Sequence, residues 1–207
     1  MKILFQGDSI TDNFTDHSDL HAMGEGYTFY ASEAISARHP SAQLEFLNFG
    51  ISGNRTCDIV ARLERDCTAH DPDLVSLLVG INDVWHRAAD KNWLPNDEFE
   101  ENYRTILRGI KEKTHAKILI LEPFLLDVPD KAFFREDLDF KIDVVRRLAR
   151  EYADAYIPLD GIFAAASVTD PMTLWAADGV HPTKNGAKLI AHHYANAFDK
   201  LFAALNV

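Results

Sequence analysis

Short apolar runs alternate with longer stretches of helical periodicity along the whole chain. The apolar runs predict five strands, at residues 2–5, 44–48, 74–79, 118–121 and 156–159. The runs at 74–79 (LVSLLV) and 118–121 (ILIL) contain little or no polar alternation. That pattern is typical of strands that are buried on both faces of a parallel sheet.

Helical periodicity fills the intervals between these strands. It predicts helices at about 27–38, 56–69, 97–114, 135–153 and 184–204. In the third of these, one face is formed by Phe99, Tyr103, Ile106, Leu107 and Ile110. The same stretch begins after an Asn-Asp pair and ends in lysines, which is the charge order that a helix dipole favours.

Strand–helix alternation of this kind predicts an α/β fold with three layers, α/β/α. Because crossovers between parallel strands are right-handed, we expect a flavodoxin-like five-stranded parallel sheet in the order 2-1-3-4-5. Ligands of such sheets collect at the carboxyl ends of strands 1 and 3. We expect one domain over residues 1–207, and we expect the segment 160–183 to be a long functional loop.

Composition narrows the classes of partner. Hydrophobic residues make up 47% and charged residues 26%, as in globular proteins, and the formal net charge is −11. A surface this negative repels phosphate backbones and anionic lipids, so nucleic acid and membrane partners are not expected.

The two cysteines, Cys57 and Cys67, would lie about 15 Å apart on one helix, too far for a disulfide.

No apolar run approaches the roughly 18 residues that a membrane helix needs. Residues 1–5 lead directly into a motif, without the hydrophobic stretch of a signal peptide. On this basis we expect the protein to be cytoplasmic.

The first predicted strand ends in the sequence QGDSIT, which places Ser9 just beyond the carboxyl end of the strand. A helix that starts there would point backbone N–H groups toward Ser9. A serine hydroxyl is a weak nucleophile that needs an adjacent base. Taken alone, Gly-Asp-Ser fits a turn or a helix cap equally well.

The second and third strands end in two further candidates. Gly50, in NFGISGNR, is predicted to let the backbone approach a ligand and present its N–H. Asn82, in GIND, is predicted to aim its side-chain amide at the same crevice, where an amide donor suits an oxyanion. Each of these segments alone is also compatible with a simple turn.

The fourth candidate is the pair Asp178 and His181 in DGVHP. An acid and an imidazole three residues apart can meet within one turn, where the carboxylate holds Nδ1–H and leaves Nε2 free to take the Ser9 proton. By itself the pair also fits a metal site or a surface turn. Together the four segments supply a nucleophile, a base, an orienting acid and oxyanion donors.

This ordered set resembles the SGNH (GDSL-type) hydrolase family, with GDSI in place of GDSL. The resemblance implies a catalytic triad of Ser9, His181 and Asp178, and an oxyanion hole formed by the N–H groups of Ser9 and Gly50 and the Asn82 amide. It implies no cofactor. The segments GISGNRT, GINDVW and WAADGVHPT further resemble acetylxylan esterases and related bacterial carbohydrate esterases.

Other kinds of site have weaker support in the sequence. The G-x-S-x-G elbow of α/β-hydrolases is missing, and neither HExxH nor CxxC occurs, so no metal is predicted. His17 and His21 are four residues apart, but a solvated loop is the favoured interpretation. Glu122 ends the fourth strand, where it could face the site or have a structural role.

The substrate is predicted from the neighbours of these motifs. Trp85 and Trp175 flank two of them and are expected to line the mouth of the pocket, with core packing as the alternative. The apolar segment 124–134 is expected to wall the cleft or to form the interface of a homo-oligomer. We expect an esterase that removes short acyl groups, above all acetyl, from small-molecule or oligosaccharide esters. The alternatives are a lysophospholipase or thioesterase of the same fold and a non-catalytic small-molecule binding protein.

Overall fold

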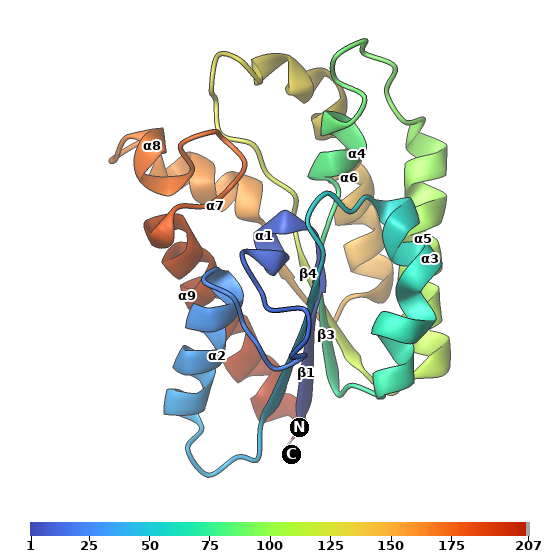
Figure 1. Ribbon diagram of the computed structural model, residues 1–207, viewed down its shortest axis with the longest axis vertical. Coiled ribbons are helices and arrows are strands. Elements are labelled where there is room, and N and C mark those ends of the chain that lie inside the picture. Colours follow the sequence, from blue (N-terminus) through green and yellow to red (C-terminus); the bar gives the residue numbers. More distant parts are fainter. Residues whose placement is uncertain (206–207) are drawn as a thin grey trace.

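A computed structural model describes residues 1–205 of the chain, and its centre is a sheet of five parallel strands (Figure 1). The strands are β1 (Lys2–Gly7), β2 (Glu45–Gly50), β3 (Leu74–Leu78), β4 (Lys117–Leu121) and β5 (Ala155–Ile157). Their order is β2-β1-β3-β4-β5, and all four neighbouring pairs are parallel. The predicted fold class and strand order are confirmed.

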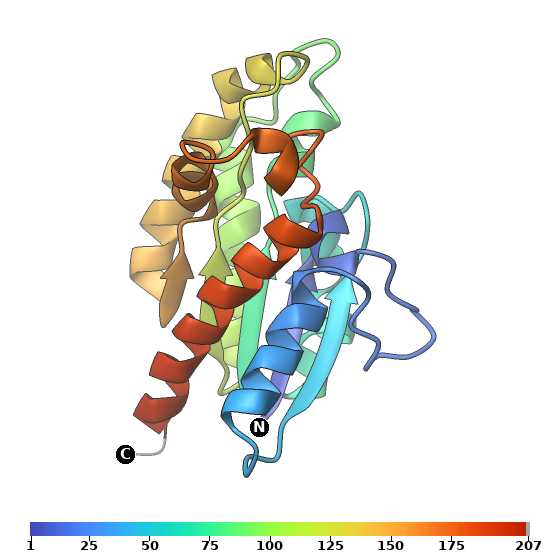
Figure 2. The ribbon, with the colours of Figure 1, turned by 90° about the vertical axis from the view of Figure 1, so that its left-hand side faces the viewer.

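Helices cover both faces of the sheet (Figure 1). One face is covered by α2 (Tyr27–Arg38), α7 (Leu159–Ala166) and α9 (Lys184–Leu205), and α2 and α9 lie side by side (Figure 2). The other face is covered by α3 (Thr56–Asp66), α5 (Asn96–Lys113) and α6 (Arg135–Tyr152). All five helices predicted from periodicity are present.

The unbroken apolar runs of the sequence are explained by this double cover. In β1, Ile3 and Phe5 pack into the core beneath α2 and α9, whereas Leu4 packs into the core beneath α3 and α5. All three side chains are fully buried. Successive residues of a strand point to opposite faces, so a strand covered on both faces needs apolar residues at every position.

The segment 160–183 differs from the prediction of a long loop. It contains most of α7, which starts at Leu159, and the short helix α8 (Met172–Trp175). The fifth strand therefore ends at Ile157 instead of residue 159. Pro158 explains the boundary, because its nitrogen has no hydrogen to donate to a sheet ladder and its fixed φ suits the residue before a helix.

Most of the large apolar side chains of the segment 124–134 are buried within the chain, so they offer little exposed apolar surface for a subunit interface. Phe124, Leu125, Leu126 and Phe134 are each at most 3% exposed. The segment folds back over the end of the sheet, where the N–H of Leu126 donates to the carbonyl of Gly179 at 2.8 Å. It therefore supports the loop that holds Asp178.

Cys57 and Cys67 are both free, as predicted. Within residues 1–205, no helix is both long enough and apolar enough to cross a membrane.

Candidate active site

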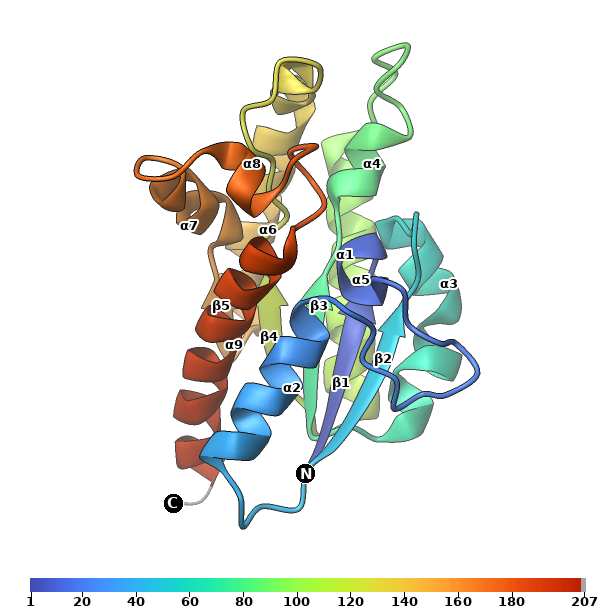
Figure 3. The same ribbon diagram turned by 60° about the vertical axis from the view of Figure 1, so that its left-hand side comes forward.

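Two very short helices begin at the carboxyl end of the sheet, and they position two of the candidate residues (Figure 3). Helix α1 (Ser9–Asp12) follows β1, and Asp8 caps it by accepting the N–H of Ile10 at 3.0 Å. Helix α4 (Ile81–Trp85) follows β3 through Gly80, whose φ of 135° is accessible to glycine. Both turns place a functional side chain at the first or second position of a helix.

The structure brings Ser9, His181 and Asp178 together. Ser9 Oγ lies 2.9 Å from His181 Nε2, and His181 Nδ1 lies 2.8 Å from Asp178 Oδ2. The other carboxylate oxygen of Asp178 accepts the backbone N–H groups of Val180 at 3.0 Å and His181 at 2.7 Å. The loop before α9 thus fixes both the acid and the imidazole, as expected from their spacing of three residues.

The charges of this pair reinforce each other. Partial burial opposes ionisation of Asp178, but the hydrogen bonds from His181 and the loop N–H groups outweigh it and lower the pKa of the carboxyl. In return, the hydrogen bond to Asp178 is the main reason why the pKa of His181 is raised. The imidazolium that forms when His181 takes a proton is therefore stabilised in place.

Two buried carboxyl groups lie behind the triad. Burial raises the pKa of Asp8 to about 7, although the Ile10 N–H and His181 act in the opposite direction. Within residues 1–205, Asp8 Oδ2 has no hydrogen-bond partner. Burial likewise raises the pKa of Asp83 to about 6, while its bonds from the N–H and hydroxyl of Thr56 act in the opposite direction. Asp83 thereby joins α4 to the start of α3.

Asn82 is the second residue of α4, at the carboxyl end of the sheet. Its Nδ2 donates one hydrogen to the carbonyl of Asn54 at 3.1 Å, which leaves the second amide hydrogen available. The N–H of Ser9 belongs to the first turn of α1, where helical N–H groups have no partner within the helix. Both groups therefore keep a hydrogen that can be donated to a ligand.

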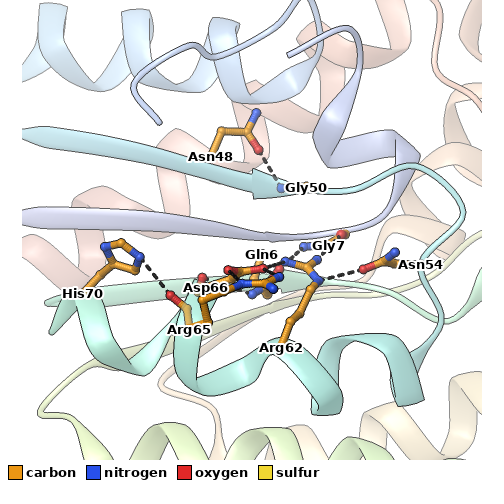
Figure 4. A network of polar contacts seen from close by, with 9 residues as sticks. All are labelled: Gln6, Gly7, Asn48, Gly50, Asn54, Arg62, Arg65, Asp66 and His70. Carbon is orange, nitrogen blue, oxygen red and sulfur yellow. Dashed lines mark hydrogen bonds and ion pairs between the residues drawn. The ribbon is translucent and has the colours of Figure 1, made fainter. Parts of the chain in front are cut away.

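The prediction for Gly50 is not supported. Its N–H already donates to Asn48 Oδ1 at 2.9 Å, so it is not free for a ligand (Figure 4). A Cβ atom on Gly50 would lie 2.2 Å from the backbone nitrogen of Asp12, so this glycine allows α1 to pack against β2. The free N–H belongs instead to Gly53, which adopts φ +82° and for which the described part of the chain offers no acceptor.

A buried arginine that the sequence did not reveal connects these loops (Figure 4). Arg62 of α3 is 7% exposed. It donates to the carbonyl of Gly7 at 3.1 Å, to Asn54 Oδ1 at 2.7 Å and to Asp66 Oδ2 at 3.3 Å. One guanidinium thus joins the end of β1, which leads to Ser9, to the residue that holds the Asn82 amide.

A cavity of about 460 Å³, the catalytic cavity below, opens beside Ser9 and His181. Its walls include Asp12, Phe14, Thr15, His17 and Ser52. Asp12 accepts both the hydroxyl and the N–H of Ser52, at 2.5 and 2.9 Å. Phe14 is 86% exposed and adopts φ 62°, a conformation that is uncommon for a bulky residue and points to function.

The remaining histidine and glutamate candidates are separate from the triad. His17 Nε2 lies 3.3 Å from Asp12 Oδ1, whereas His21 Nδ1 donates to the carbonyl of Phe46 at 3.1 Å, so the two rings do not form a pair. Within residues 1–205, no group of three or more side chains is placed to hold a metal ion. Glu122 is fully buried against Arg146 and the N–H of Asp160, which is a structural role.

The two tryptophans have different environments. Trp85 is half-buried, and its ring lies 5.8 Å from the His181 ring and 5.1 Å from the Lys131 ammonium, which places it beside the triad. Trp175 packs against the hydrophobic core, and its carbonyl accepts the N–H of Thr183 at 2.8 Å. The backbone of Trp175 therefore secures the loop that contains His181, and its half-buried ring contacts the core.

Comparison with known proteins relates the chain to ester hydrolases. Residues 5–189 match the GDSL-like Lipase/Acylhydrolase family. The chain is 31% identical over 202 residues to an acetylxylan esterase of Geobacillus stearothermophilus, covering 93% of this chain and 91% of that protein. The crystal structure of an acetylxylan esterase from the same organism superposes with a TM-score of 0.86 at 30% identity, over 95% of this chain and 93% of the other.

Three further structures of that esterase are described as catalytic mutants, in which a serine, a histidine or an aspartate is replaced by alanine. They superpose on this chain at 29% identity, with TM-scores of 0.86, 0.86 and 0.85. Together with the family match over most of the chain, this similarity shows to which family the chain belongs. The chain belongs to the GDSL-like lipase/acylhydrolase family and is a carboxylic ester hydrolase.

Proposed function

We propose that this chain is a serine esterase that removes acetyl groups from acetylated carbohydrates. The central observation is the continuous line of hydrogen bonds from Ser9 Oγ through His181 to Asp178, at 2.9 and 2.8 Å. The acetylxylan esterase to which the chain is similar supports the acetyl-sugar substrate. The family membership argues against the alternative of a non-catalytic binding protein.

In the first step, Ser9 Oγ attacks the ester carbonyl while His181 Nε2 takes the hydroxyl proton. His181 then gives this proton to the leaving oxygen of the sugar, which departs as a hydroxyl group while the tetrahedral intermediate collapses to an acyl-enzyme. Water, activated by the same imidazole, releases acetate and restores Ser9. Asp178 keeps the imidazole in the required orientation and stabilises its charged form.

The negative oxygen of the intermediate needs donors that are already in place. We assign this role to the N–H of Ser9, the N–H of Gly53 and the free hydrogen of Asn82 Nδ2. Gly53 replaces Gly50 in this assignment because its N–H is unpaired in the described structure and because its neighbour Asn54 holds the Asn82 amide. Each such donor is worth about 3–4 kcal/mol of barrier.

The walls of the catalytic cavity favour a sugar alcohol over a long acyl chain. Asp12, Thr15 and Ser52 supply polar atoms, which suit the hydroxyl groups of a carbohydrate. Phe14 and Trp85 add aromatic surface near His181, on which the apolar face of a sugar ring can pack. The net charge of −11 also disfavours the anionic phospholipid surfaces that a lysophospholipase would meet.

The test measures acetate released from acetylated xylo-oligosaccharides by the wild type and by Ser9→Ala. Ser36→Ala, at an exposed position of α2, is the matched control. We expect Ser9→Ala to lose activity and to resist labelling by a fluorophosphonate, while Ser36→Ala behaves as the wild type. Activity of Ser9→Ala near the wild-type level would refute the assignment of the nucleophile.

A panel of aryl esters of increasing acyl length separates the remaining alternative. An acetylesterase has its highest kcat/KM on the aryl acetate, the ester with the shortest acyl group of the panel. A maximum at eight or more carbons would instead indicate a lysophospholipase or thioesterase.

A further inference from the structure

A second cavity lies directly beside the catalytic cavity and has the same volume, about 460 Å³. It is formed between the starts of α2 and α9, which run side by side and begin at the same end of the sheet as α1 (Figures 2 and 3). Its walls include Glu25, Phe29, Tyr30, Thr183 and Lys184. We call it the Phe29 cavity. Both volumes fall in the range of small-molecule sites, about 300–1,000 Å³.

The two cavities share Asn13 and Pro182 as lining residues. Pro182 directly follows His181 in the chain. Asn13 ends α1 with φ 35°, and its carbonyl accepts the N–H of Glu25 at 2.9 Å, which fixes the turn before α2. A ligand that extends from the catalytic cavity over Asn13 and Pro182 therefore enters the Phe29 cavity.

The lining of the Phe29 cavity combines an aromatic surface with polar groups. Phe29 is 41% exposed although it lies in the first turn of an otherwise well-packed helix. Its ring meets the Tyr30 ring edge-on, with centroids 5.3 Å apart, and the Lys188 ammonium lies 5.5 Å from the Tyr30 centroid. These contacts hold Tyr30 in place, so the two rings form a prepared surface.

Polar groups stand at the edge of this surface. Glu25 can accept hydrogen bonds, Lys184 can donate them, and the Thr183 hydroxyl already donates to the carbonyl of Leu174. The exposed face of an aromatic ring beside donors and acceptors matches a sugar ring, which has an apolar face and a rim of hydroxyl groups.

We propose that the Phe29 cavity is a second carbohydrate subsite, which binds the sugar residue next to the acetylated one. This inference rests on the proposed function and adds to it that the substrate is an oligosaccharide. Binding energy from the second residue is then available to position the ester at Ser9, so that longer substrates react with higher kcat/KM than small acetyl esters.

The test compares Phe29→Ala with the wild type on two substrates, acetylated xylo-oligosaccharides and 4-nitrophenyl acetate. We expect the small ester to occupy only the catalytic cavity, because it has no second sugar residue. Phe140→Ala is the matched control, because Phe140 is an exposed phenylalanine (60%) on α6, on the other side of the molecule. Phe29→Tyr keeps the aromatic ring and serves as the rescue variant.

We expect Phe29→Ala to lose about tenfold in kcat/KM on the oligosaccharide, as for one aromatic contact, and to keep wild-type activity on the small ester. Phe29→Tyr and Phe140→Ala should retain activity on both substrates. If Phe29→Ala is unchanged on the oligosaccharide, or loses equally on both substrates, the subsite is refuted while the esterase function stands. A wild type that cleaves only the aryl ester refutes the carbohydrate function itself, and the subsite with it.

Discussion

Arg62 offers a sharp test of how the loops of the active site are held together. The change Arg62→Met keeps most of the volume of the side chain and removes its three hydrogen bonds, to Gly7, Asn54 and Asp66. We expect a loss of stability and, separately, a loss of kcat. The second effect distinguishes a positioning residue from one that only stabilises the fold.

The size of the stability loss follows from the hydrogen bonds that each partner of Arg62 keeps in the variant. The Gly7 carbonyl keeps the N–H of Ile51 at 3.1 Å, and Asp66 keeps two hydrogen bonds from Arg65. Asn54 Oδ1, in contrast, has no other donor in the described structure. Asn54 is only partly buried, so the loss of this bond costs at most about 1–3 kcal/mol, less than the 3–5 kcal/mol of a buried charge left unpaired.

The loss of kcat follows from the backbone of the same residue. The carbonyl of Asn54 holds the Asn82 amide at 3.1 Å, so a displaced Asn54 also displaces an oxyanion donor. Complete loss of such a donor lowers kcat by about 10²–10³, and a displaced donor should lower it by about 10–100. KM should change little, since the ground-state ester does not use this donor fully.

Steady-state kinetics and denaturant unfolding measure the two effects separately. Arg65→Met is the matched control: Arg65 also contacts Asp66, but its side chain is 75% exposed, and we expect wild-type kcat and nearly wild-type stability. If Arg62→Met unfolds more easily but keeps wild-type kcat, Arg62 has no positioning role and our reasoning about the Asn54 loop is wrong.

Three further predictions concern the triad and its surroundings. Asp178→Asn removes the group that raises the pKa of His181, so the acid limb of kcat/KM against pH should move to lower pH as activity falls; an unmoved limb would contradict the assigned cause. Asn82→Ala should lower kcat by about 10²–10³ with a small change in KM, measured on 4-nitrophenyl acetate, and an unchanged kcat would remove Asn82 from the oxyanion hole. Asp8→Asn can still accept the N–H of Ile10 but no longer ionises. Because the folded protein binds this proton more tightly, with a pKa of about 7 against 3.8, ionisation of Asp8 costs the wild type stability as pH rises from about 4 to 7. Urea unfolding should therefore show the variant gaining stability relative to the wild type over that range, and parallel pH curves would contradict the raised pKa.

The sheet and the proximity of Asp178 and His181 could be predicted from sequence because their signals are local. Buried parallel strands leave unbroken apolar runs, and the spacing of Asp178 and His181 allows them to meet within one turn. The topology then brings Ser9 to the same edge of the sheet. Each inference depends on neighbouring residues and on one general rule of strand order.

The errors have a common cause in tertiary contacts. Gly50 and Gly53 both look like turn glycines, and only the bond from Gly50 to Asn48 Oδ1 shows which N–H is occupied. The apolar segment 124–134 looks exposed in the sequence, and only the tertiary structure shows that most of its large apolar side chains are buried. Arg62 lies on an amphipathic helix, where nothing in the sequence separates a buried arginine from a solvated one.

The contact between Ser9 and His181 joins residues 172 positions apart in the chain. Ser9 lies in α1, directly after β1, and His181 lies just before α9. Loop closure over such a separation is slow compared with the local pairing of β1 and β2. Esterase activity should consequently be among the last properties to return during refolding, which makes the reaction itself a reporter of when the C-terminal part of the chain reaches its native position.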